Sequence, residues 1–152
     1  KEDFTESIPD SVATSWQRAV SMIKYSNDRS EDDMLLQIRK TCEYVKLNFR
    51  QTGSLPKQES VAYLLTCAVR ECVTNAVRYA EATELYVAFS EMEAEASVTV
   101  SNNGNIPKGE VVEGGGLSTL RRRIERAGGR MTVQSRPRFE LTVTVPKGKE
   151  GV

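Results

Sequence analysis

The segment that most constrains this chain is 58–80, which is dense in Val, Leu and Ala. Its pattern predicts a helix of more than about five turns. Because the segment is apolar on nearly every side, we expect the helix to be buried over most of its surface. The chain has 152 residues, 39% of them hydrophobic and 28% charged, so it has the composition of a globular domain with one core.

Other segments predict the elements around this helix. Helical spacing is found over 10–25, over 117–127 and, after a capping box at Ser30 and Asp33, over 30–42. Alternating apolar and polar residues predict strands at 45–50, 85–90, 96–100, 131–135 and 139–145. Strands joined in hairpins, with helices between them, indicate an α+β fold. We expect a two-layer α/β sandwich, with a mixed, mostly antiparallel sheet packed under about three helices.

Composition excludes several kinds of chemistry. The chain has no histidine, so a Ser-His-Asp triad, a His-ligated zinc site and a phosphohistidine cannot form within it. Basic and acidic residues number 21 each, and the zero net charge argues against nucleic-acid binding. Three cysteines without metal-site spacing fit buried thiols in a reducing cytosol. No segment has the apolar length of a membrane span.

Three polar side chains interrupt the apolar helix on one face. Glu71, Asn75 and Arg78 recur at i, i+4 and i+7, a narrow stripe at ~100° per residue. Such a stripe is most often a solvated edge, because charged residues usually face water. The alternative is a pocket, since a carboxylate and an amide one turn apart are oxygen ligands that Mg²⁺ accepts together with substrate phosphates.

Two glycine-bearing segments follow. Asn102-Asn103-Gly104 comes directly after a strand, where it is typical of a turn. Gly114-Gly115-Gly116-Leu117 leads into a helix, where backbone amides and the helix dipole favour phosphate oxygens. Alone, this run is weak support, because it has neither the P-loop nor the dinucleotide pattern. Together with the acid-amide helix face, the two segments predict a nucleotide pocket.

These segments resemble three motifs of one ATPase superfamily. Residues 70–80, Arg-Glu-Cys-Val-Thr-Asn-Ala-Val-Arg-Tyr-Ala, resemble the N box shared by DNA gyrase, the large heat-shock chaperones, mismatch-repair proteins and histidine kinases. Residues 102–104 resemble the first glycine box, and 114–123 with Gly128-Gly129 the second. The order and spacing are most similar to sensor histidine kinases of the nitrate/nitrite-sensor and desaturase-regulator type. The resemblance covers roughly 31–146 and implies a Bergerat-type ATP-binding fold.

The resemblance implies roles for residues on the helices. Glu71 would be the acid that polarises water or a metal-bound group, and Asn75 would be a magnesium ligand. Arg78 would meet phosphate. Arg121 and Arg123 stand where the superfamily carries arginines after the lid, which implies contact with phosphate or with a partner hairpin, although a solvated face is the commoner role for an arginine-rich helix.

The glycine boxes are also given roles by the resemblance. Asn102 would accept a hydrogen bond from the exocyclic amine of adenine, and Gly104 would let the pocket wall approach closely. Gly114, Gly116 and Leu117 would border the triphosphate of a bound Mg-ATP, and residues 105–113 would be the ATP lid.

Two positions depart from the pattern. Asn102 replaces the usual aspartate, so a charge-assisted hydrogen bond becomes a neutral one of roughly half the strength. We therefore expect ATP binding that is weaker than the norm but not lost. Tyr79 stands where related kinases usually have histidine, and its role is open.

The missing histidine has a meaning within this resemblance. A histidine kinase phosphorylates a histidine on a separate dimerising hairpin, so the chain is expected to be the catalytic ATP-binding domain without it. We expect a connection at 1–29, the domain at 30–147 and a frayed tail at 148–152. The partners implied are that hairpin, a second copy of the full-length protein and a response regulator. The location implied is cytoplasmic, either in a cytosolic sensor or as the cytoplasmic part of a membrane-bound one.

Two other functions fit the same sequence. The first is a degenerate nucleotide-binding module that regulates a partner by contact, which Asn102 keeps open. The second is an anti-sigma-factor serine kinase, which needs no hairpin. The Leu-Ser-Thr-Leu-Arg-Arg-Arg continuation of the second glycine box favours the sensor kinase.

Overall fold

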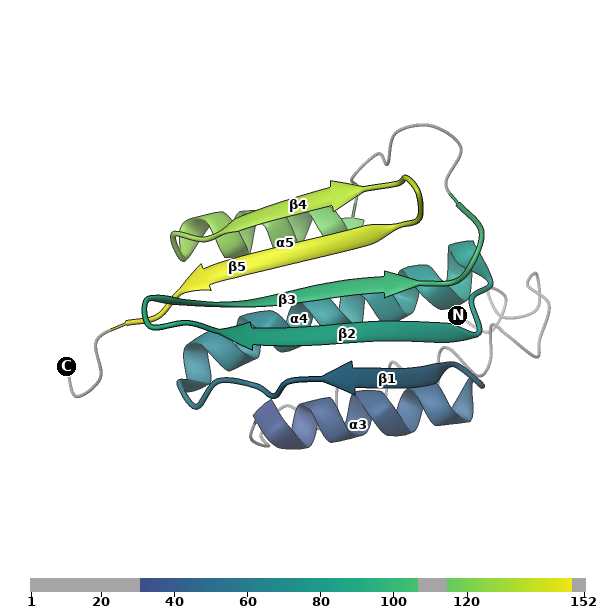
Figure 1. Cartoon of the computed structure of the whole chain (residues 1–152), viewed down its shortest axis with the longest axis horizontal. Helices are drawn as coiled ribbons and strands as arrows, with labels where there is room; N and C mark the ends of the chain where they lie inside the picture. The colour runs from purple at the N-terminus through teal and green to yellow at the C-terminus, as the bar shows by residue number, and fades with distance from the viewer. Residues whose placement is uncertain (1–30, 107–114, 149–152) are drawn as a thin grey trace, which may run out of the picture.

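The computed structural model describes residues 31–106 and 115–148, which form a five-stranded sheet and three α-helices (Figure 1). The helices are α3 (Glu31–Tyr44), α4 (Glu59–Asn75), which continues into a π-helical turn η1 (Ala76–Ala80), and α5 (Gly115–Arg126). The strands are β1 (Asn48–Thr52), β2 (Glu84–Glu91), β3 (Glu95–Asn102), β4 (Arg130–Gln134) and β5 (Glu140–Pro146). The predicted α+β architecture is confirmed, and the helix predicted over 10–25 lies outside the described residues.

The sheet has the order β1-β2-β3-β5-β4. Strands β1 and β2 are parallel, and every other neighbouring pair is antiparallel, so the sheet is mixed and mostly antiparallel as predicted. Two predicted hairpins, β2–β3 and β4–β5, are confirmed. The chain leaves β3 through α5 before it returns to β4, and β5 then lies between β3 and β4 (Figure 1).

Helix α4 is the centre of the core. It lies behind β2 and β3, while α5 lies behind β4 and β5 (Figure 1). It contacts α3, α5, β3 and β5, which explains why the segment is apolar on nearly every side. Each fully buried Val or Leu contributes about 1.5–3 kcal/mol to this core. The buried residues of α4 are Val61, Ala62, Leu65, Thr66, Cys67, Ala68, Val69, Cys72 and Val73.

The strand predicted at 45–50 begins three residues later. Residues 45–47 instead complete the C-terminal turn of α3, where Leu47 N–H donates to the Cys42 carbonyl at 2.8 Å. Lys46 has a left-handed φ of 65°, which interrupts an extended backbone. The alternation of apolar and polar residues was therefore a correct sign of half-burial, but the first three positions belong to the helix end.

The C-terminal end of the domain is tied down as far as the structure describes it. Lys147 Nζ donates to Glu91 Oε2 at 2.9 Å and to the Met92 carbonyl at 2.7 Å. Gly148 N–H donates to Gln58 Oε1 at 3.0 Å, so the predicted fraying does not begin at this residue. Among the described helices, none is both long and apolar enough to cross a membrane.

Candidate functional site

The site forms where the C-terminal half of α4 meets the end of β3 and the start of α5. Glu71 and Asn75 lie one turn apart on α4, and both are half-buried. The three-residue stripe predicted from the sequence stops there, because α4 gives way to the π-helical turn at Ala76. A π-turn holds more residues than an α-turn, so the ~100° spacing no longer applies to Arg78. Arg78 is exposed, and its guanidinium carbon lies 5.5 Å from the ring centre of Tyr79.

The turn after β3 packs directly on the end of this helix. Asn102 is only 2% exposed, and its Oδ1 accepts a hydrogen bond from Gly104 N–H at 2.8 Å. Asn105 N–H donates to the Ala80 carbonyl at 2.7 Å. A methyl group on Gly104 would overlap that carbonyl oxygen and lie 2.7 Å from Ala80 Cβ. Glycine is therefore required at 104 for the turn to close on the helix.

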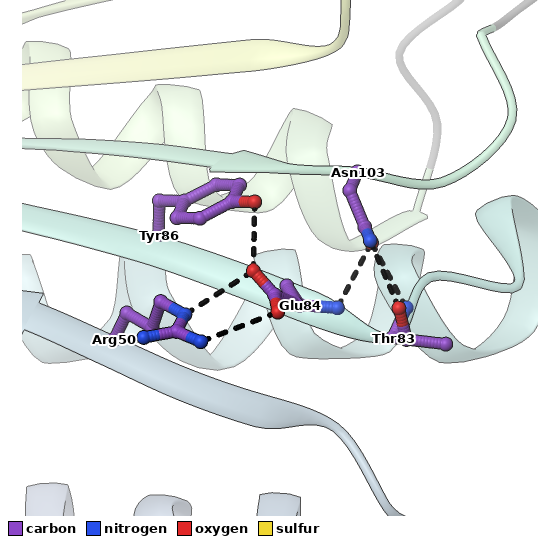
Figure 2. Close-up of polar contacts among 5 residues, drawn as sticks. All are labelled: Arg50, Thr83, Glu84, Tyr86 and Asn103. Carbon is purple, nitrogen blue, oxygen red and sulfur yellow. Dashed lines mark hydrogen bonds and ion pairs between the residues drawn. The ribbon is translucent and has the colours of Figure 1, made fainter.

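Asn103 fixes the same turn to the beginning of β2, as Figure 2 shows. Its Oδ1 accepts hydrogen bonds from the backbone N–H groups of Thr83 and Glu84, both at 2.9 Å. Its Nδ2 donates to Thr83 Oγ1 at 2.8 Å. The sequence predicted a turn here but not this bridge, which depends on where β2 begins. The only signal for it was a second asparagine in a turn motif.

The outer face of the sheet continues this network (Figure 2). Arg50 binds the Glu84 carboxylate with Nε and Nη2 at 3.2 and 3.3 Å, and the Tyr86 hydroxyl donates to Glu84 Oε1 at 2.8 Å. These contacts lower the pKa of Glu84, with the Arg50 hydrogen bond as the first cause. They also raise the pKa of Tyr86, because its hydroxyl donates to the Glu84 carboxylate. Glu84 is thus held through its backbone N–H by Asn103 and through its carboxylate by Arg50 and Tyr86.

On the opposite side of the site, the start of α5 lies against Glu71. A methyl group on Gly116 would overlap the Glu71 carboxylate. A cavity of about 260 Å³ adjoins this contact and is lined by Cys67, Arg70, Glu71, Gly115, Gly116, Thr119, Leu120 and Arg123. Burial raises the pKa of Glu71, and the nearby charges of Arg70 and Arg123 partly offset that effect.

The structure separates the arginines of α5. Arg121 Nη1 donates to the Met131 carbonyl at 2.8 Å and lies 3.7 Å from Glu125 Oε2, so it faces the edge of β4. Arg123 lines the cavity, with Nη1 3.9 Å from Cys67 Sγ and 3.5 Å from the Tyr63 hydroxyl. Sequence reasoning gave the two arginines the same role and overlooked Arg70. A helix face cannot be assigned from a run of three arginines until the packing of the helix is known.

The remaining predicted site residues have different positions. Leu117 is 7% exposed and belongs to the hydrophobic core. Gly114 and most of the predicted lid lie outside the described residues. The described residues hold no cluster of three or more His, Cys, Asp or Glu side chains that suits a metal ion. Glu71 and Asn75 nevertheless place a carboxylate and an amide oxygen on one helix face, the kind of oxygen donors that Mg²⁺ accepts when water and phosphate complete its shell.

Comparisons with known proteins give consistent matches. The family model described as "Histidine kinase-, DNA gyrase B-, and HSP90-like ATPase" matches residues 61–149. The sensor histidine kinase DesK of Bacillus subtilis is 30% identical over 90 residues, which cover 57% of this chain and 24% of DesK. The chain therefore spans about a quarter of the length of this curated relative.

Solved structures match the fold. The blue-light activated histidine kinase EL346 of Erythrobacter litoralis superposes with a TM-score of 0.60 at 18% identity, covering 85% of this chain and 51% of that chain. The ATP-binding domain of PrrB from Mycobacterium tuberculosis has a TM-score of 0.51 at 19% identity, covering 68% and 82%. The catalytic domain of histidine kinase ThkA has a TM-score of 0.57 at 18% identity, covering 79% and 92%.

Proposed function

Because the chain belongs to the family of histidine kinase-, DNA gyrase B- and HSP90-like ATPases, we propose that it binds ATP between α4, the turn after β3 and the start of α5. It would do so as the catalytic ATP-binding domain of a sensor histidine kinase. The observation that carries the proposal is that both glycine segments close on one helix. Gly104 lies against Ala80, and Gly116 lies against Glu71.

The turn after β3 is the proposed base side of the site. Asn102 is buried beside Gly104, and an amide oxygen can accept the exocyclic amine of adenine. This oxygen already accepts the Gly104 N–H, and it carries no net charge. Both facts support binding that is weaker than an aspartate would give.

The helix face of Glu71 and Asn75 is the proposed phosphate side. Asn75 would hold Mg²⁺, which would neutralise phosphate charge when bound, and Glu71 beside it would be the acid–base group. Arg78 and the backbone at Gly114 and Gly116 are proposed to meet the phosphates. Arg121 is proposed to hold α5 against β4 rather than to contact phosphate, because its guanidinium donates to the Met131 carbonyl. Leu117 is proposed to support the glycine turn from the core rather than to contact nucleotide.

The reaction would be phosphoryl transfer, in which the protein mainly positions the reactants and stabilises charge. Glu71, with its pKa raised by burial, would take up the proton released by the attacking group. The chain has no histidine, so the acceptor must be on another segment or protein. We propose a dimerising hairpin of the full-length sensor as the acceptor and a response regulator as the next recipient.

The test is calorimetric titration of this chain with a non-hydrolysable ATP analogue, with and without Mg²⁺. We expect saturable binding that depends on Mg²⁺. No heat of binding up to millimolar nucleotide would overturn the proposal and leave a regulatory module that acts by protein contact.

A further inference from the structure

Arg70 and Arg123 line the cavity beside Glu71, and their charges act on its carboxylate without forming an ion pair with it. Arg70 projects from α4 and Arg123 from α5, and Cys67 Sγ lies between them at 3.8 and 3.9 Å from the nearest guanidinium nitrogens. A thiol sulfur is a weak acceptor, and each guanidinium has five N–H donors. Within 31–106 and 115–148, neither side chain forms an ion pair, and the Glu71 carboxylate turns toward Gly116 instead.

Other arginines of the described residues form ion pairs with glutamates or hydrogen bonds to backbone carbonyls. Arg50 and Arg130 pair with glutamates across the sheet at 3.2 and 3.5 Å. Arg121, two residues before Arg123, binds a carbonyl on β4. Unused donors at Arg70 and Arg123 therefore face a space of about 260 Å³. A planar fork of donors of this kind matches the oxygens of a phosphate.

The position of the cavity along α4 agrees with this chemistry. The base side of the site adjoins Ala80, and Asn75, Glu71 and Arg70 follow in that order toward the start of the helix. The five α-helical steps from Arg70 to Asn75 span ~8 Å, and the π-helical turn adds further length before Ala80, so the separation is on the length scale of an extended nucleotide. A triphosphate running from the base side along α4 would reach the cavity with its last phosphate.

We propose that Arg70 and Arg123 together bind the terminal phosphate of the nucleotide and so distinguish a nucleoside triphosphate from a diphosphate. This inference rests on the nucleotide binding proposed above.

The experiment compares Arg70→Gln, Arg123→Gln and the double variant with Arg122→Gln, an exposed neighbour on α5 whose Nη1 lies 3.5 Å from Ser118 Oγ. Each is titrated, in the presence of Mg²⁺, with a non-hydrolysable ATP analogue, with ADP and with inorganic tripolyphosphate. We expect each cavity variant to bind the ATP analogue about 10-fold or more weakly, because a charged hydrogen bond is lost. We expect ADP affinity to change by less than about 2-fold, and Arg122→Gln to resemble the wild type.

The outcomes separate this inference from the proposed function. Unchanged affinity for the ATP analogue, or an equal loss for ADP, would overturn the assignment of the two arginines. If the wild type binds neither nucleotide, the proposed function fails, and tripolyphosphate decides the cavity: arginine-dependent binding supports an anion site, and no binding removes it. Arg70→Lys and Arg123→Lys, which keep the charge and lose the fork, replace any glutamine variant that does not unfold cooperatively, with a smaller loss expected.

Discussion

The proposed base side and the proposed phosphate side of the site are built from different contacts. Around Asn103 and Gly104, backbone and side-chain groups form hydrogen bonds of 2.7–3.2 Å, and the turn touches the backbone of Ala80. Around Glu71 and Gly116, a flexible carboxylate meets a glycine, and the arginines have only contacts of 3.5–3.9 Å to a hydroxyl and a thiol. The base side is thus part of the folded scaffold, while the phosphate side keeps its polar groups available for a ligand. Substitutions on the first should cost stability, and substitutions on the second should cost binding.

The largest effect is expected from Asn75→Ala on the phosphate side. This change removes the proposed amide ligand of Mg²⁺ at a half-buried position, while the buried face of α4 is untouched. Magnesium-dependent nucleotide binding should be abolished, and urea unfolding should stay cooperative with a similar midpoint. Calorimetry and a denaturation curve check both parts, and an unchanged affinity would remove Asn75 from the site.

A matched pair of glycine variants tests the comparison directly. Gly104→Ala forces a methyl group onto the Ala80 carbonyl and Cβ, which are backbone and helix atoms that cannot retreat. Overpacking of this kind costs about 1–3 kcal/mol of unfolding free energy. Gly116→Ala meets only the Glu71 side chain, which can rotate away. We expect this variant to keep most of its stability and to lose nucleotide affinity, and equal destabilisation of the two would contradict the distinction.

Asn103→Ala removes three hydrogen bonds to Thr83 and Glu84 at once. The expected loss is about 1–2 kcal/mol, because both backbone donors lie near the surface and water can replace part of the contact. Asn103→Asp is the control, since its carboxylate can still accept from both N–H groups and the Thr83 hydroxyl can turn to donate to its other oxygen. Chemical denaturation of the two variants should therefore rank alanine below aspartate.

Asn102→Asp, on the proposed base side, should strengthen nucleotide binding, whereas the variants above weaken binding or stability. The carboxylate would still accept the Gly104 N–H, and it would form a charge-assisted bond to an adenine amine. We expect about 2–10-fold tighter binding of the ATP analogue. A buried charge also lowers the stability of the free domain, because residue 102 is 2% exposed. Tighter binding without loss of stability would show that the carboxylate reaches water.

Sequence patterns predicted most of the fold because the burial of apolar side chains determines the spacing of apolar residues in its helices and strands. The apolar density of 58–80 located α4, and the alternation in 85–100 located the β2–β3 hairpin. Two features were not predictable. The π-helical turn at Ala76–Ala80 depends on how the helix end meets the turn after β3, which is a tertiary contact. The different contacts of Arg121 and Arg123 depend on where α5 packs. The sequence alone does not distinguish the two residues, because both are arginines in the same run on one helix.

The smallest effect, and the most specific to the phosphate side, is the pH dependence of Glu71→Gln. Burial raises the pKa of this carboxyl in the folded state above its ordinary value of 4.5. A raised pKa means that the folded state binds the proton more tightly than the unfolded state. The protonated Glu71 carboxyl therefore makes its full contribution to the free energy of unfolding below pH 4.5, and this contribution is lost as the pH rises through the pKa of the folded state. Glutamine cannot ionise, so the variant should be more stable than the wild type at pH 7 and no more stable at pH 4. Glu93→Gln, in the exposed β2–β3 turn, provides the same chemical change with little expected effect. Thermal unfolding at the two pH values measures the difference, and a variant that is less stable at pH 7 would mean that Arg70 and Arg123 stabilise the carboxylate more than burial opposes it.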